Sequence, residues 1–162
     1  MNFERLLELQ KTLDDRILDE HHLHTSDLFS RKLLALQVEV GELANETRCF
    51  KFWSTKSPAP KEIILEEYVD GIHFILSLGL ELGISEVSSY EQKDVSQSPV
   101  IAFQEVYHAI DILRENQNVE SFHVLLEKYL QLAIAIDLNI DAIERAYLKK
   151  NEINHQRQNQ GY

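Results

Sequence analysis

The sequence predicts an all-α fold, a helical bundle of about six helices. Only 5 Gly and 3 Pro occur among 162 residues, which leaves little room for the many tight turns of a sheet of short strands. Apolar residues make up 44% of the chain, an ordinary share for a globular protein, and they recur at helical spacing. A chain of this length can bury a core of its own. We therefore expect one domain over residues 1–162.

The first three helices are each marked by an apolar row and by a signal at one end. Residues 3–20 have an amphipathic pattern and are followed by a polar, histidine-containing break. Ser26 or Asp27 can cap a second helix, which runs to about Cys49. After a loop with two prolines, a third helix covers about 61–83 and ends near a glycine.

Three further helices are expected in the second half of the chain. The polar segment 86–98 is predicted to be a loop, and Pro99 favours the start of a helix over 99–116, because proline suits a first helical turn. A fifth helix over 119–136 has a row of phenylalanine, leucine and isoleucine on one face. Residues 138–157 make the sixth.

Charge and composition exclude several classes of protein. A formal net charge of −11 argues against direct nucleic-acid binding, which needs a basic stripe, although bound cations can still admit a small anionic substrate. The single cysteine, Cys49, rules out an intrachain disulfide and suits a reducing compartment. The start of the chain lacks a signal-peptide pattern, and the longest apolar run is too short to span a bilayer. We expect a cytoplasmic protein without a membrane partner.

Two acidic pairs on neighbouring helices are the most informative feature, Glu39-Val-Gly-Glu42 and Glu67-Tyr-Val-Asp70. The spacing of three puts both carboxylates of a pair on one helix face, with Cβ atoms roughly 5–6 Å apart. The second pair interrupts an apolar stripe that begins at Ile63 and is predicted to face the core. Acids at such positions are rare unless they are paired or hold a metal ion, and no Lys or Arg interleaves the stripe.

Four converging carboxylates would either protonate or recruit divalent cations. At an effective dielectric constant near 20, each close pair repels by roughly 4 kcal/mol. Ligation by oxygen alone selects Mg²⁺ or Mn²⁺ rather than Zn²⁺. Such ions bridge carboxylates to substrate phosphates, polarise a phosphoryl group and supply hydroxide. The alternative interpretation is a solvated acidic helix face.

Aromatic and imidazole side chains near these pairs have two interpretations each. Phe50, Phe52 and Trp53 precede the proline-containing loop and form either a packing cluster or a platform for a flat ring. His73 follows Asp70 by one turn, so it is either a satisfied core histidine or a group that touches a ligand.

The end of the chain carries a row of basic and amide side chains. Lys150, Asn154 and Arg157 recur at helical spacing on one face and could hold phosphate oxygens. Basic residues in a last helical turn also complement the helix dipole without any ligand.

Together these motifs resemble those of the dimeric all-α dUTP pyrophosphatases (dUTPases) of bacterial and phage type, relatives of the MazG-like nucleotide pyrophosphatases. The similarity covers nearly the whole chain. It rests on Leu9-Gln10 with Leu13-Asp14, Glu39-Val-Gly-Glu42, Phe50-Lys-Phe-Trp53-Ser, Glu67-Tyr-Val-Asp70-Gly-Ile-His73-Phe-Ile-Leu-Ser, and the tail from Lys150 to Tyr162. Asp14 stands where some relatives carry Asn.

The resemblance implies a fold, an activity and a partner. The fold would be a bundle with the four-helix core of the all-α NTP pyrophosphatases. The activity would be Mg²⁺-dependent hydrolysis of dUTP to dUMP and pyrophosphate, and of dUDP to dUMP and phosphate, with Mn²⁺ as a possible substitute. The protein would act as a homodimer in which each site borrows residues from the partner.

The resemblance also implies a role for individual residues. Glu42 would position and deprotonate the attacking water. The metal ligands would be Glu39, Glu42, Glu67 and Asp70. The deoxyuridine would contact Gln10, Trp53, His73 and Asn154. The phosphates would be held by Lys150, Arg157 and Tyr162.

Two other functions remain open from the sequence. The same pyrophosphatase chemistry could act on another nucleotide, such as dCTP. A non-enzymatic helical interaction module would instead use the acidic surface to bind a partner or to sequester cations.

Overall fold

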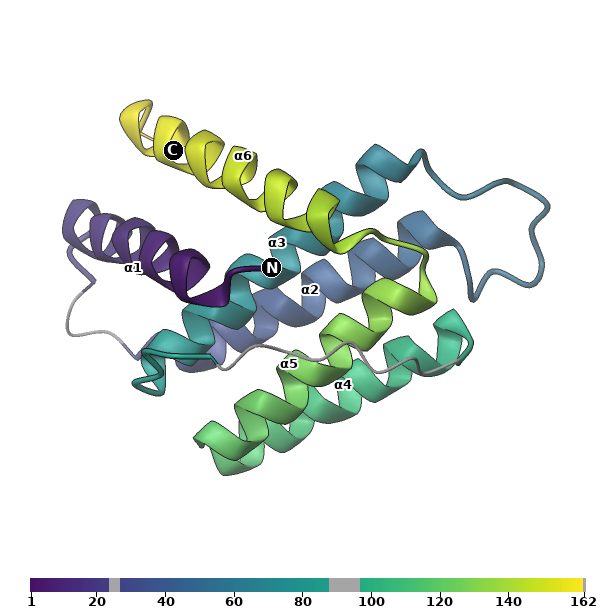
Figure 1. The fold of residues 1–162 in the computed structure, drawn as a ribbon, viewed down its shortest axis with the longest axis horizontal. Helices are drawn as coiled ribbons and strands as arrows, with labels where there is room; N and C mark the ends of the chain where they lie inside the picture. The colour runs from purple at the N-terminus through teal and green to yellow at the C-terminus, as the bar shows by residue number, and fades with distance from the viewer. Residues whose placement is uncertain (24–26, 88–96, 162) are drawn as a thin grey trace.

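The computed structural model describes residues 1–23, 27–87 and 97–161, and these residues form six α-helices and no strand. The all-α prediction is therefore confirmed, and the predicted helix ends agree with the observed ones to within a turn. The helices are α1 (Phe3–Glu20), α2 (Phe29–Thr47), α3 (Lys61–Glu81), α4 (Pro99–Asn116), α5 (Val119–Ala135) and α6 (Ile140–Asn159) (Figure 1). Within the described ranges, no helix combines the length and apolar character needed to cross a membrane.

Local hydrogen bonds explain where several helices begin. The side chains of Asn2, Ser98 and Asn139 each accept a backbone N–H in the first turn of α1, α4 and α6. Asn118 and Ser121 form a reciprocal capping box at the start of α5.

The start of α2 tests the predicted cap at Ser26 or Asp27. The N-cap residue is Leu28, which makes no capping hydrogen bond through its side chain, so the cap predicted at Asp27 is wrong by one residue. The Asp27 carboxylate nevertheless accepts the backbone N–H of Phe29, the first residue of α2, at 3.2 Å. Ser26 lies outside the described residues, as do residues 88–96 of the predicted loop.

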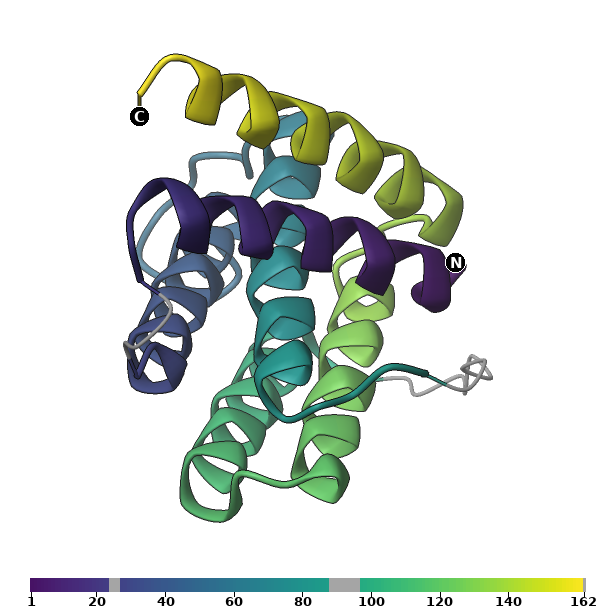
Figure 2. The ribbon, with the colours of Figure 1, turned by 90° about the vertical axis from the view of Figure 1, so that its left-hand side faces the viewer.

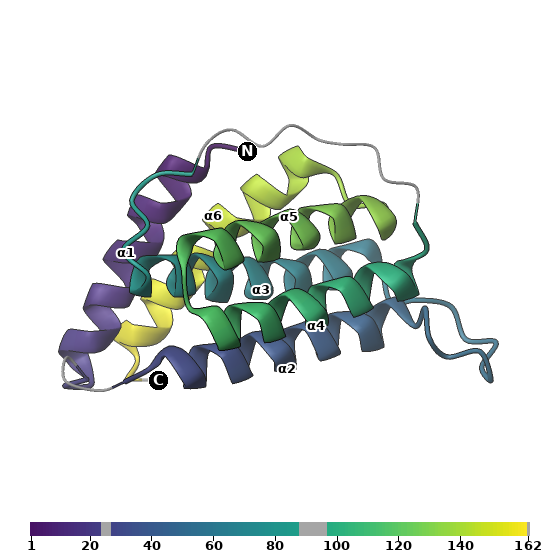
Figure 3. The ribbon, with the colours of Figure 1, turned by 90° about the horizontal axis from the view of Figure 1, so that it is seen from below.

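Helices α2 to α5 form a four-helix core, in which α2 contacts α3 and α4, and α5 contacts the same two helices. Helices α1 and α6 contact each other and lie across α3 on one side of this core (Figures 2 and 3). Both run in the same direction, so their carboxyl ends lie together, where His21 contacts Gln158. Helix α3 is therefore covered by neighbours on opposite sides.

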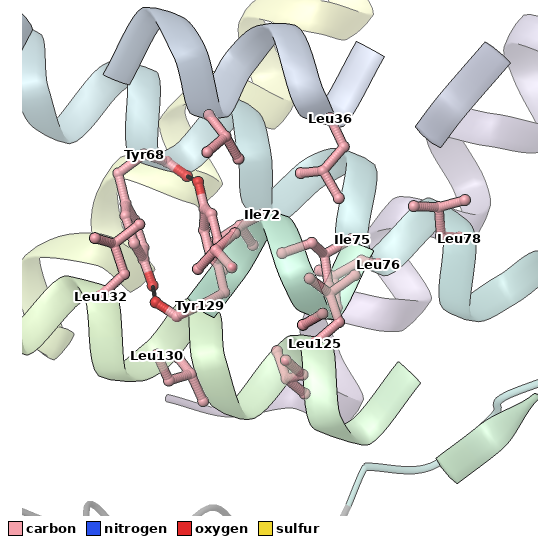
Figure 4. Packing of buried hydrophobic residues seen from close by; sticks show 14 of the residues in the cluster. Leu36, Tyr68, Ile72, Ile75, Leu76, Leu78, Leu125, Tyr129, Leu130 and Leu132 are labelled. Atoms are coloured by element: carbon pink, nitrogen blue, oxygen red, sulfur yellow. Dashed lines mark hydrogen bonds between the residues drawn. The ribbon is translucent and has the colours of Figure 1, made fainter. Parts of the chain in front are cut away.

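The contact between α3 and α5 is centred on two fully buried tyrosines. Tyr68 and Tyr129 stack with ring centroids 4.5 Å apart, and each hydroxyl donates to the other's backbone carbonyl at 2.9 Å (Figure 4). Gly71 makes room for this pair, because a Cβ at that position would lie 2.0 Å from the Tyr129 hydroxyl oxygen. Gly41 has no such constraint, since a Cβ there would only touch the Tyr107 hydroxyl at 3.4 Å.

The predicted core-facing stripe of α3 is wrong at its first position. Ile63 is 41% exposed, whereas the neighbouring Ile64 and then Tyr68, Ile72 and Ile75 are buried. In the first half of α3 the core face is therefore turned by one residue from the predicted stripe, and Glu67 and Asp70 lie half-buried at its border. Because α1 and α6 also contact α3, periodicity alone does not indicate which side of the helix faces α2 and α5.

Candidate functional site

Three of the four predicted metal-binding carboxylates come together where α2 packs on α3. One oxygen from each of Glu39, Glu67 and Asp70 lies within 4.8 Å of the others. All three side chains are half-buried. Glu42 is more exposed and lies outside this group, but its charge acts on both Glu39 and Glu67. Helical spacing places the two acids of each pair on one face of α2 or α3, and the packing of α2 against α3 then brings the carboxylates of different helices together.

The cluster resists full ionisation. Burial raises the pKa of Glu39 from 4.5 to about 7, with further contributions from the charges of Asp70, Glu42 and Glu67. Burial is also the largest cause of the raised pKa values of Glu67 and Asp70. A bound divalent cation would favour the charged carboxylates. Because the donors are all carboxylate oxygens, the set fits Mg²⁺ or Mn²⁺.

A lysine from α6 lies beside the cluster. Lys150 is buried, and its Nζ is 2.7 Å from Asp70 Oδ2 and 3.0 Å from Glu66 Oε1. The sequence contains no cation within the α3 stripe, and the counter-charge comes instead from a helix 80 residues away in the chain. Pattern analysis of a single helix cannot detect such a contact.

A cavity of about 310 Å³ adjoins the cluster, a size that can admit a small ligand. Its lining includes Glu39 and Asp70 together with apolar side chains of α1. The cavity wall also includes four predicted substrate-binding residues, Gln10, His73, Asn154 and Arg157. The structure thus groups four of the seven predicted substrate-binding residues beside two of the predicted metal ligands.

A buried chain of hydrogen bonds runs along the cavity wall. Gln10 Oε1 lies 2.8 Å from His73 Nδ1 and accepts the Tyr147 hydroxyl at 2.8 Å. Gln10 Nε2 donates to Asp14 Oδ1 at 2.7 Å, and the Ser77 hydroxyl donates to Asp14 Oδ2. Tyr147 was not singled out from the sequence, and Ser77 was quoted only as the end of the His73 motif, without a role, although it follows His73 by one turn as Asp14 follows Gln10.

His73 is neutral and only partly satisfied by the protein. Burial, followed by the nearby charge of Lys150, lowers its pKa from 6.5 to about 3. Its ring stacks on Tyr147 with centroids 4.1 Å apart. Nε2 is buried and has no hydrogen-bond partner within the described part of the chain. His73 therefore has the burial and ring stacking of a core histidine, and it also has a nitrogen, Nε2, that a ligand could contact.

Two of the other three predicted substrate-binding residues, Trp53 and Lys150, are not on the cavity wall. Trp53 is 65% exposed, and its ring packs edge-on against Phe50 and Phe52. Lys150 is paired with Asp70 and Glu66 as described above. Tyr162 lies outside the described residues.

Comparison with known proteins identifies the family. No functionally curated protein matches the chain at a significant level. A family model described as dUTPase matches residues 2–162, which is nearly the full length. The protein therefore belongs to the all-α dUTPase family of dUTP-hydrolysing enzymes.

Proposed function

We propose that the enzyme is a Mg²⁺-dependent dUTP diphosphatase that converts dUTP to dUMP and pyrophosphate, and dUDP to dUMP and phosphate. One observation carries this proposal: the carboxylates of Glu39, Glu67 and Asp70 converge beside a cavity of about 310 Å³. The whole chain would act as one domain in the cytoplasm, where its single cysteine stays reduced.

Glu39, Glu42, Glu67 and Asp70 are the proposed metal ligands. Bound Mg²⁺ would supply Lewis-acid stabilisation of the phosphate oxygens and of the negative charge on the leaving group. The exposure of Glu42 at the edge of the cluster suits a residue that must also reach solvent water. Glu42 would orient that water and accept its proton as the general base.

The cavity residues would recognise the substrate. Gln10, His73 and Asn154 would contact the deoxyuridine, since all three line the cavity and carry hydrogen-bonding atoms. Arg157, on the same wall, would pair with phosphate oxygens. Lys150 and Tyr162 would join it when the triphosphate is bound.

We also propose a homodimer in which Trp53 serves the partner's site. Phe52 and Trp53 are large aromatic side chains in solvent, and exposed apolar clusters of this kind commonly mark protein contacts. Leu34, Val38 and Ile101 add exposed apolar side chains on α2 and α4. Contact through these helices would bring the aromatic loop of one protomer to the other.

A nucleotide panel tests the proposed specificity. Purified protein is incubated with Mg²⁺ and dUTP, dCTP, dTTP or UTP, and the mononucleotide and pyrophosphate formed are quantified by chromatography. We expect dUMP and pyrophosphate from dUTP and far slower turnover of the other three. Equal rates would remove the assigned base specificity, and the absence of hydrolysis with every nucleotide would leave only a helical interaction module.

A further inference from the structure

The hydrogen-bond chain beside the cavity has a defined direction. Gln10 has one terminal atom 2.7 Å from an Asp14 oxygen and the other 2.8 Å from His73 Nδ1. A carboxylate can only accept hydrogen bonds, whereas an amide end is either a donor NH₂ or an acceptor oxygen. The NH₂ of Gln10 must therefore face Asp14, and its oxygen must face His73.

This orientation determines which nitrogen of His73 carries the proton. An amide oxygen can only accept, so Nδ1 must be the N–H nitrogen. A neutral imidazole has one N–H, and burial keeps His73 neutral by lowering its pKa to about 3. Nε2 is therefore left as a hydrogen-bond acceptor, buried and without a protein partner among the described residues.

Asp14 is itself held in place. The Ser77 hydroxyl donates to Asp14 Oδ2, and Lys32 Nζ lies 3.5 Å from the same oxygen. Both side chains of the Asp14–Lys32 pair are largely buried. The carboxylate thus has a donor on each oxygen and cannot turn without losing one of them.

Tyr147 does not set the direction. Its hydroxyl donates to Gln10 Oε1 at 2.8 Å, but the carbonyl of Leu6 lies 3.2 Å away and could take the same hydrogen. A hydroxyl also accepts hydrogen bonds, so Tyr147 would tolerate a reversed Gln10 amide. Asp14 is therefore the hydrogen-bond partner that restricts the Gln10 amide to one orientation.

We propose that Asp14 is a positioning residue for nucleoside recognition, which acts through Gln10 to fix the Nδ1–H tautomer of His73 and so reserves Nε2 as an acceptor for a donor group of the nucleotide. Such a donor is an imide N–H of the base or a hydroxyl of the sugar. This recognition step rests on the proposed function, whereas the tautomer itself does not.

The tautomer is measured on the nucleotide-free protein by ¹⁵N NMR of the histidine side chains near neutral pH. The His73 signals are assigned from the spectrum of His73→Gln. We expect a pyrrole-type Nδ1 and a pyridine-type Nε2 in the wild type. A wild-type spectrum in which His73 Nε2 is protonated overturns the proposal directly.

Asp14→Asn tests the origin of the tautomer, because an amide at this position can face Gln10 with either end. We expect the two His73 nitrogen signals to move toward each other as the tautomers mix. Asp15→Asn is the matched control, since Asp15 is the next residue of α1, 56% exposed and paired with Lys11. Tyr147→Phe should also keep the wild-type tautomer. An unchanged His73 spectrum in folded Asp14→Asn would refute the role of Asp14.

Kinetics on the same variants test the recognition step. Asp14→Asn should raise KM for dUTP by about three- to tenfold, the range expected for one weakened hydrogen bond, with a smaller change in kcat. Asp15→Asn should leave both constants unchanged. An unaltered KM in Asp14→Asn, despite a shifted tautomer, would overturn the recognition step. A wild type that hydrolyses no nucleotide would defeat the proposed function and leave the tautomer result standing.

Discussion

Lys150 Nζ lies 2.7 Å from Asp70 Oδ2. The two residues belong to α6 and α3, and the ammonium neutralises a carboxylate that the proposed metal site also needs. A Glu66 oxygen completes the contact at 3.0 Å. In the absence of a divalent ion, Lys150 therefore acts as a counter-charge for the acidic cluster, and it lowers the pKa values of Glu39, Glu67 and Asp70.

Replacement of this lysine should strengthen metal binding and weaken nucleotide binding. In Lys150→Met, the affinity for Mn²⁺ without nucleotide should rise by about tenfold, because a charge-assisted hydrogen bond no longer competes for Asp70. The KM for dUTP should rise because a phosphate contact is lost. Calorimetric titration with Mn²⁺ measures the first effect. Lys149→Met, at an exposed neighbouring position, controls for net charge, and an Mn²⁺ affinity equal to that of the wild type in Lys150→Met would contradict the competition.

Glu42→Gln should abolish most of the turnover while leaving the fold intact. The substitution preserves the shape of the side chain and removes the proposed base, which contributes roughly 10²–10⁴-fold to a rate. Steady-state release of pyrophosphate from dUTP is the measurement, with circular dichroism to verify the helices. Glu62→Gln, at an exposed position in the first turn of α3, should retain activity. Wild-type turnover in Glu42→Gln would remove Glu42 from the mechanism.

The raised pKa of Glu39 should make stability depend on pH. This carboxyl group titrates near 4.5 when unfolded and near 7 when folded, so the folded state holds the proton more tightly between these values. The resulting stabilisation is complete below 4.5 and is lost as the pH rises to about 7. Without metal ions, the free energy of unfolding of the wild type should fall relative to Glu39→Gln across this window.

Urea unfolding in the presence of a chelator measures that difference at several pH values. Glu62→Gln serves as an exposed control and should run parallel to the wild type. Saturating Mg²⁺ should reduce the slope, because the cation takes the place of the proton. Parallel curves for the wild type and Glu39→Gln would show that folding does not raise the pKa of Glu39.

Gly71→Ala should destabilise the protein by roughly 1–3 kcal/mol, the usual cost of overpacking. The added methyl group would overlap the Tyr129 hydroxyl and disrupt its stacked pair with Tyr68. Gly41→Ala is a useful comparison, because it adds the same group where only ordinary contact results, and it should change stability by no more than about 1 kcal/mol in the favourable direction. Equal effects at the two positions, measured by urea unfolding, would contradict the close approach of α3 and α5.

Much of the fold could be predicted from the sequence because helical periodicity is a local property. All six helices follow from apolar spacing and end signals, and the acidic pairs follow from a spacing of three on α2 and α3. The face that each helix buries depends on its neighbours. The stripe that begins at Ile63 fits helical spacing, but the structure buries the neighbouring Ile64 and leaves Ile63 exposed.

Long-range contacts account for what the sequence could not show. The pairing of Lys150 with Asp70 and the bond between Tyr147 and Gln10 each join α6 to a helix far away in the chain. Asp14 was visible one turn after Gln10, but its contact with Ser77 depends on the packing of α1 against α3. The exposure of Trp53 likewise depends on the course of a loop rather than on a repeating pattern.

The central claim is that the acidic cluster acts by binding divalent cations. The metal dependence of dUTP cleavage tests this claim most directly. The formation of dUMP and pyrophosphate is followed in chelator-treated enzyme and then during titration with Mg²⁺. We predict no detectable turnover in chelator and full recovery as Mg²⁺ is added. Undiminished hydrolysis in the presence of the chelator would contradict the proposed role of Glu39, Glu42, Glu67 and Asp70.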